Sequence, residues 1–101
     1  MIHHLDLEFD KIVDGTCDFF KIDKPAILGK SRKRELSDAR HMLYKYAHET
    51  GVFKCAYISN KIGNRDHSTV SSGIKTLNQL LDNTEILRRI YLEYKIHLQK
   101  K

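Results

Sequence analysis

The chain has 101 residues, of which 41% are hydrophobic and one is proline, and its formal net charge is +5 at pH 7. This length and composition predict one globular domain, residues 1–101, and exclude a disordered tail. No apolar run is long enough to cross a membrane and no signal peptide is recognisable at the start, so we expect a cytoplasmic protein.

Two cysteines, Cys17 and Cys55, are too few and too far apart for a disulfide framework or a Cys-x-x-Cys metal site. We expect both to be reduced and buried. The basic charge balance favours an acidic partner, but the distribution of the charges decides more than their sum.

The first thirty residues predict two helices. Asp6 can cap a helix that runs to about Phe20, because apolar residues recur in that stretch at spacings of three and four. Asp23 is a second N-cap candidate, and Pro25 suits the first turn of the short helix that follows. Gly29 is expected to end that helix.

A basic run from Lys30 to Arg34, KSRKR, comes next. A solvated loop is one interpretation of such a run. A clamp on phosphates or in a DNA minor groove is the other, because arginine suits the strong negative potential of a narrow minor groove. The run alone leaves both interpretations open.

A third helix is expected from about Glu35 to Glu49, where apolar residues share one face. Arg40, His41 and His48 lie off that face. The two histidines are two turns apart, which is too far for shared metal ligation without further ligands. Polar surface and phosphate contact therefore remain the two interpretations of these three side chains.

The stretch from Cys55 to Leu81 has the pattern of a helix-turn-helix. A first helix from Cys55 to Ile62 is followed by Gly63-Asn64, two residues that tolerate positive φ in a tight turn. Asp66 then caps a second helix to about Leu81, because its carboxylate can accept a hydrogen bond from the amide of Ser68 or Thr69.

A last helix is expected between Thr84, as its cap, and about Leu98. Its apolar stripe comprises Leu87, Ile90, Tyr91, Tyr94 and Leu98. Together these patterns predict an all-α fold, a compact bundle of about six helices that contains a helix-turn-helix.

The run IGNRDHSTV, residues 62–70, resembles the signature of the C-terminal DNA-binding domain (domain IV) of the bacterial replication initiator DnaA, which reads FGGRDHTTV or close to it. A second similarity joins SRKREL, residues 31–36, and Ala39-Arg40-His41 to the basic loop of that family and the helix after it. The resemblance runs from about Leu7 to the end of the chain. It implies a Trp-repressor-like helix-turn-helix fold.

The N-terminal residues of the second helix of a helix-turn-helix meet base edges in the major groove. In the family that the chain resembles, the matching Asp-His-Thr residues contact bases and a basic-loop arginine enters the minor groove, which implies the latter role for Arg32. Arg65 is either a DNA contact or a structural tie of the turn. The candidate DNA-binding residues are Arg32, Lys33, Arg34, Arg40, His48, Arg65, Asp66, His67, Ser68 and Thr69.

Sequence-specific binding of duplex DNA is therefore the predicted function, at sites like DnaA boxes and with a role in regulating replication initiation or transcription. A monomer is expected, and the replication initiator machinery is a candidate partner. We expect no enzyme, nucleotide, cofactor or metal, because there is no P-loop and the adjacent His67 and Ser68 point apart on a helix. The alternative is a protein-interaction module that docks or dimerises through the stripe of the last helix.

Overall fold

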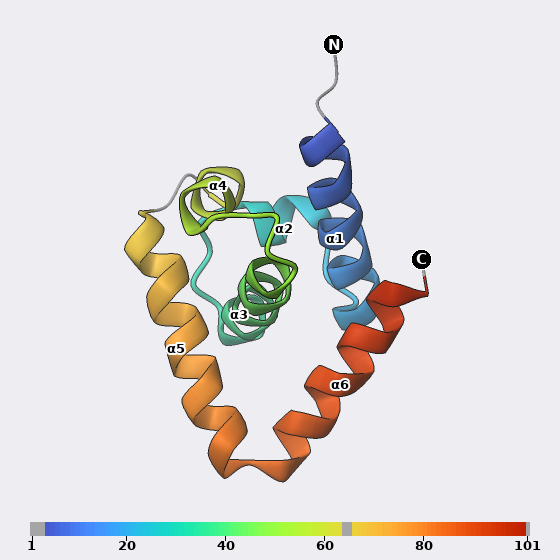
Figure 1. The fold of residues 1–101 in the computed structure, drawn as a ribbon, viewed down its shortest axis with the longest axis vertical. Helices are drawn as coiled ribbons and strands as arrows, with labels where there is room; N and C mark the ends of the chain where they lie inside the picture. The colour runs from blue at the N-terminus through green and yellow to red at the C-terminus, as the bar shows by residue number, and fades with distance from the viewer. Residues whose placement is uncertain (1–3, 64–65, 101) are drawn as a thin grey trace.

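The computed structural model describes residues 4–63 and 66–100, and these residues form six helices and no strand (Figure 1). The helices are α1 His4–Phe20, α2 Lys24–Leu28, α3 Arg34–Glu49, α4 Cys55–Lys61, α5 His67–Asn83 and α6 Glu85–Gln99. The predicted all-α bundle with a helix-turn-helix, formed here by α4 and α5, is confirmed.

The predicted role of Asp6 as a helix cap is wrong. Because α1 begins at His4, Asp6 lies in its first turn. The Asp6 carboxylate accepts a hydrogen bond from the Tyr57 hydroxyl and lies 3.2 Å from Nζ of Lys61. It therefore ties the start of α1 to α4, the first helix of the helix-turn-helix.

Asp23 caps α2 through its backbone and not through its side chain. It is extended, its side chain makes no cap hydrogen bond, and its carbonyl accepts from the amides of Ala26 and Ile27 at 3.0 and 3.2 Å. Gly51 has φ +78° after α3, as glycine at the end of a helix commonly does.

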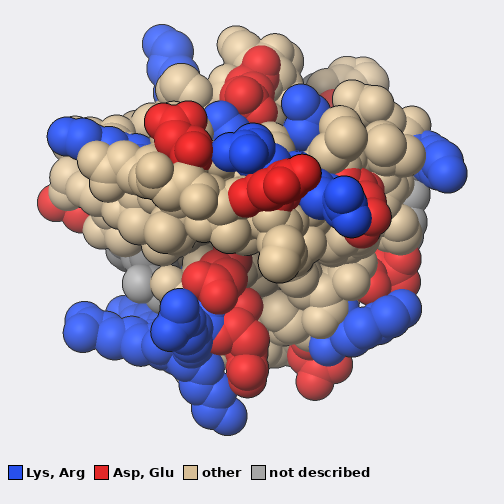
Figure 2. Space-filling model, turned by 90° about the horizontal axis from the view of Figure 1, so that it is seen from below, with Lys and Arg blue, Asp and Glu red and all other residues tan. Residues whose placement is uncertain are grey.

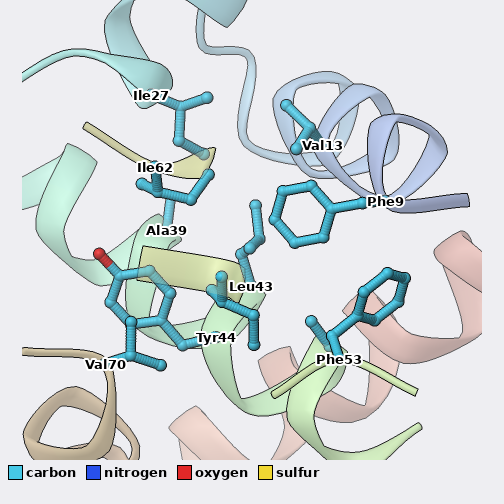
Figure 3. Close-up of a cluster of buried hydrophobic side chains, with 11 residues drawn as sticks. Phe9, Val13, Ile27, Ala39, Leu43, Tyr44, Phe53, Ile62 and Val70 are labelled. Atoms are coloured by element: carbon cyan, nitrogen blue, oxygen red, sulfur yellow. The ribbon is translucent and has the colours of Figure 1, made fainter. Parts of the chain in front are cut away.

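The other helices surround α3, with α1 and α6 on one side and α4 and α5 on the other (Figure 1). Leu43 of α3 is fully buried at the centre of the main apolar cluster (Figure 3). Phe9 and Phe53 pack on one side of this cluster, and Tyr44 and Val70 lie on the other. The main core therefore joins α1, the centre of α3 and the start of α5.

A second cluster lies where α6 packs against α3 and α5. Tyr91 and Tyr94 of α6 are buried with Met42 and Leu77, and Leu87 and Leu98 pack against them. The hydroxyls of Tyr94 and Thr16 are 2.7 Å apart in a buried hydrogen bond with α1. The stripe that the alternative interpretation offered to a partner therefore closes the core of the domain.

The two cysteines are free, and both are half-buried, so the prediction that they are buried is wrong. Burial, assisted by the nearby Asp14 carboxylate, raises the pKa of the Cys17 thiol. Among residues 4–63 and 66–100 no group of three or more His, Cys, Asp or Glu side chains could hold a metal ion. No helix in this part of the chain combines the length and apolarity needed to cross a membrane.

Gly73 allows α5 to lie close against α3. A Cβ atom at this position would come within 2.9 Å of His41 Cδ2 and 3.1 Å of Tyr44 Cδ2. Both neighbours are rings held in the α3–α5 packing, with Tyr44 buried and His41 half-buried, so neither is the mobile end of a flexible side chain.

Gly73→Ala should therefore destabilise the domain by about 1 kcal/mol. The cost of overpacking, about 1–3 kcal/mol, exceeds the gain of about 1 kcal/mol in helix propensity. Urea unfolding would measure the change, with Ser72→Ala on the exposed side of the same turn as the control. A Gly73→Ala variant that is more stable than the wild type would contradict this packing.

Candidate nucleic-acid interface

The turn between α4 and α5 has the features that the sequence predicted within its described residues. Gly63 has φ +72°, in the left-handed region. Asp66 is the N-cap of α5: its carboxylate accepts from the Ser68 amide at 3.5 Å, and its carbonyl accepts from the Thr69 amide at 2.9 Å. The predicted cap is confirmed. Asn64 and Arg65, which the predictions also included, lie outside the described residues.

The N-terminus of α5 presents four exposed polar side chains, those of Asp66, His67, Ser68 and Thr69. Val70 follows them and is fully buried in the main core. One apolar side chain thus anchors the first turn while the polar ones face outward. His67 Nδ1 lies 3.3 Å from Asp66 Oδ1, but both side chains are mostly exposed, so this pair adds little stability.

A hollow of about 200 Å³ connects this end of α5 to the basic loop, residues 30–34. Arg32 from the loop and Thr69 from α5 both line it, although they are far apart in the sequence. Its remaining lining residues are Ser31, Ser37, Arg40, His41 and Tyr44. The hollow places two of the predicted DNA-reading residues on one face of the molecule.

Sequence reasoning named His41 and His48 of α3 as candidate phosphate contacts but missed Ser37 and Tyr44 of the same helix, which also line the hollow. Ser37, His41 and Tyr44 are spaced by four and three residues, so they lie on one side of α3. His48 is four residues further along that side and is exposed. The sequence shows this spacing, but it does not show which other helix packs against that side of α3.

The side chains of the basic loop are exposed, and they surround the N-terminus of α3. Lys33 is the N-cap residue and makes no side-chain cap hydrogen bond, and Arg34 is the first residue of the helix. The positive end of the helix dipole disfavours cations there by about 0.3–1 kcal/mol each. The positive charges of Lys33 and Arg34 therefore lower the stability of α3 slightly.

Figure 2 views the end of the molecule where α5 meets α6. Lys and Arg side chains gather at the lower left of this view, whereas along its upper part they alternate with Asp and Glu. The positive charge is therefore unevenly distributed, and one corner of this face is strongly basic.

The prediction that Arg40 contacts phosphate is wrong, because this side chain is only 3% exposed. Its guanidinium group donates hydrogen bonds to the backbone carbonyls of Ala26, Ile27, Gly29 and Ser31, at 2.5–2.9 Å. A buried cation with four backbone acceptors is satisfied within the protein. The spacing of residues along α3 could not predict this burial, because the four acceptors come from a different segment of the chain.

This geometry, two short-linked helices with the polar N-terminus of the second exposed beside a basic loop, defines a helix-turn-helix domain. The chain belongs to the helix-turn-helix family of the bacterial DnaA protein, whose family model matches residues 9–77.

Curated relatives agree with this assignment. The chain is 34% identical over 92 residues to the chromosomal replication initiator protein DnaA of Synechococcus sp. (strain JA-2-3B'a(2-13)), covering 90% of this chain and 18% of that protein. It is also 34% identical over 92 residues to the protein of the same name from Bacteroides thetaiotaomicron, with 91% and 20% covered. The chain spans about one-fifth of the length of these two relatives.

His41 is the one predicted surface side chain of α3 that is half-buried at the contact with α5. Burial lowers the pKa of its imidazole below the ordinary value of 6.5, and the Asp38 carboxylate only partly opposes this effect. The unfolded chain therefore binds a proton at position 41 more readily than the folded domain does.

The contribution of neutral His41 to the free energy of unfolding should be complete above the ordinary pKa of about 6.5. It should be lost as the pH falls from there toward the lower pKa of His41 in the folded domain. In urea unfolding at a series of pH values, the wild type should lose more stability on acidification than His41→Gln. His48→Gln, at an exposed position of the same helix, is the matched control. Parallel pH curves for the wild type and His41→Gln would rule out this coupling.

Proposed function

We propose that this domain binds duplex DNA in a sequence-specific manner. The N-terminus of α5 enters the major groove, and the basic loop lies on the adjacent minor groove and backbone. The hollow lined by both Arg32 and Thr69 carries this proposal, because it puts the two elements on one side of the domain. Membership of the DnaA helix-turn-helix family supports it.

The four polar side chains of α5 have suitable chemistry for base edges. Carboxylates accept from the amino group of cytosine, hydroxyls bond to several edges, and a threonine methyl packs on the methyl of thymine. Asp66, Ser68 and Thr69 supply these groups, and His67 adds a ring nitrogen that can donate or accept. All four are exposed at the end of a helix that the core holds in place.

The basic loop supplies the electrostatic part of the proposal. Lys33 and Arg34 lie at the N-terminus of α3, where their charges do not stabilise the helix, but the same charges can neutralise phosphate groups. Arg32 is exposed, lines the hollow and is proposed to enter the minor groove. His48, exposed on the same side of α3, is proposed as a further phosphate contact.

Sites like DnaA boxes are the proposed targets, since the curated relatives are chromosomal replication initiator proteins. The proposed role is to act in replication initiation, or to regulate it or transcription, as a cytoplasmic monomer without catalysis or a bound nucleotide. The alternative, an interaction module that uses the stripe of α6, is disfavoured because Tyr91 and Tyr94 of this stripe are buried and its other residues pack against the second cluster.

His67→Ala and Asp66→Ala should each cost roughly 1–3 kcal/mol of affinity for a selected duplex, and non-specific affinity should change little. Asp66→Ala should also cost about 1 kcal/mol of stability, because it removes the cap of α5. Binding-site selection from random duplexes, followed by titration against a scrambled duplex, measures both. Gln79→Ala, on the exposed C-terminal half of α5, is the control. Unchanged discrimination in both variants would exclude α5 from the major groove.

Lys33→Ala and Arg34→Ala should weaken binding to all duplexes alike. Each should reduce the slope of log affinity against log salt concentration by about 0.9 if it removes one phosphate contact. Lys11→Ala, an exposed lysine of α1, lowers the net charge equally and should leave the slope nearly unchanged. Equal slopes for all three variants would mean that the loop acts only through the net charge of the domain.

A further inference from the structure

We infer that Arg40 is a positioning residue for DNA recognition: from inside the protein it fixes the backbone from which Arg32 projects. The inference rests on the proposed function, because it concerns how the minor-groove arginine is held. It assigns to the buried Arg40 of α3 a role that the exposed cations of the basic loop do not have.

The contacts of Arg40 converge on one short segment. Its Nε donates to Ile27 O at 2.8 Å, Nη2 donates to Ala26 O and Gly29 O at 2.8 and 2.9 Å, and Nη1 donates to Ser31 O at 2.5 Å. All four acceptors lie within six residues of one another, between the end of α2 and the basic loop. A single side chain thus joins this whole segment to the centre of α3.

Arg40 supplies donors at the C-terminal end of α2, where the last carbonyls of a helix have no partner within the helix. Ala26 and Ile27 are in the last turn of α2 and Gly29 is its C-cap, and the Gly29 amide also donates to the Ala26 carbonyl at 3.3 Å. A helix of five residues is also too short to be stable by itself. The cationic guanidinium suits this end of a helix, since the dipole favours positive charge there.

The fourth contact leads directly to Arg32. The Ser31 carbonyl and the Arg32 amide belong to one planar peptide group, so the bond from Nη1 fixes the orientation of the plane that precedes Arg32. On the other side of Arg32, the Lys33 carbonyl accepts from the amides of Leu36 and Ser37 at 3.1 and 3.0 Å. The backbone on both sides of Arg32 is therefore held, while its side chain remains exposed.

Lysine at position 40 separates geometry from charge. It keeps the positive charge, but its three donors radiate from one nitrogen and cannot reproduce a planar fork that reaches four separate carbonyls. Arg40→Lys should therefore loosen the segment before Arg32 without changing the net charge of the domain. If Arg40 acted only through its positive charge, this substitution would leave DNA binding unchanged.

The test measures affinity for duplexes that share a selected site and differ only in A·T or G·C flanks. The wild type should prefer A·T flanks, and Arg32→Ala should bring the ratio of affinities to about one. Arg40→Lys should lower the ratio to the same value, and the double variant should show no further loss. Tyr94→Phe, which removes the buried Thr16 hydrogen bond far from the loop, is the control for lost stability and should keep the wild-type ratio.

The outcomes are distinguishable. A wild-type ratio in folded Arg40→Lys overturns the inference, and so does a loss in Tyr94→Phe equal to that in Arg40→Lys. A wild type without any sequence preference instead overturns the proposed function, and this inference with it, before any Arg40 variant is considered.

A measurement on the wild type keeps the inference testable even if Arg40→Lys fails to fold. The NMR signal of the Arg40 Nε–H should exchange slowly with water without DNA and should keep its position when the duplex is added. The Arg32 signal should shift on the same addition. An Arg40 signal that exchanges fast, or that shifts as much as that of Arg32, overturns the inference.

Discussion

The close contact between α5 and α3 at Gly73 is the constraint on which the rest of the candidate interface depends. His41 and Tyr44 occupy the space that a Cβ atom at position 73 would need, so the two helices approach as closely as their backbones and these rings allow. Thr69 lies one turn before Gly73, at the hollow that it shares with Arg32. The separation between the end of α5 and the basic loop is therefore set by a contact that involves none of the residues proposed to read DNA.

The two apolar clusters hold α5 at two points along its length. Val70 packs with Leu43 in the main cluster, directly after the exposed polar turn, and Leu77 packs with Met42 in the second. Two anchors on one side of a helix fix its rotation as well as its position, because residues seven apart lie on the same face. The tyrosines of α6 complete the second anchor, so the stripe of α6 contributes to the position of α5.

Local patterns in the sequence were sufficient for the elements of the fold. The helices follow from apolar spacing, and the turn before α5 follows from Gly63 and the cap at Asp66, whose effects reach only a few residues along the chain. The predictions failed where a polar side chain is satisfied by a distant segment. Asp6 binds groups on α4, some fifty residues away, and Arg40 binds carbonyls before α3. Such pairings depend on the tertiary arrangement, which spacing within one helix does not contain.

Two arginines of α3 show why net charge is a poor guide to function. Arg40 and Arg34 are six residues apart on the same helix, but one is buried against four carbonyls and the other is exposed at the positive end of the helix dipole. The first placement stabilises the fold. The second opposes it by about 0.3–1 kcal/mol, where a serine or aspartate at the cap would have helped. A cation at a position that the helix disfavours is consistent with the proposed function, in which an anionic partner lies across the hollow lined by Arg32 and Thr69.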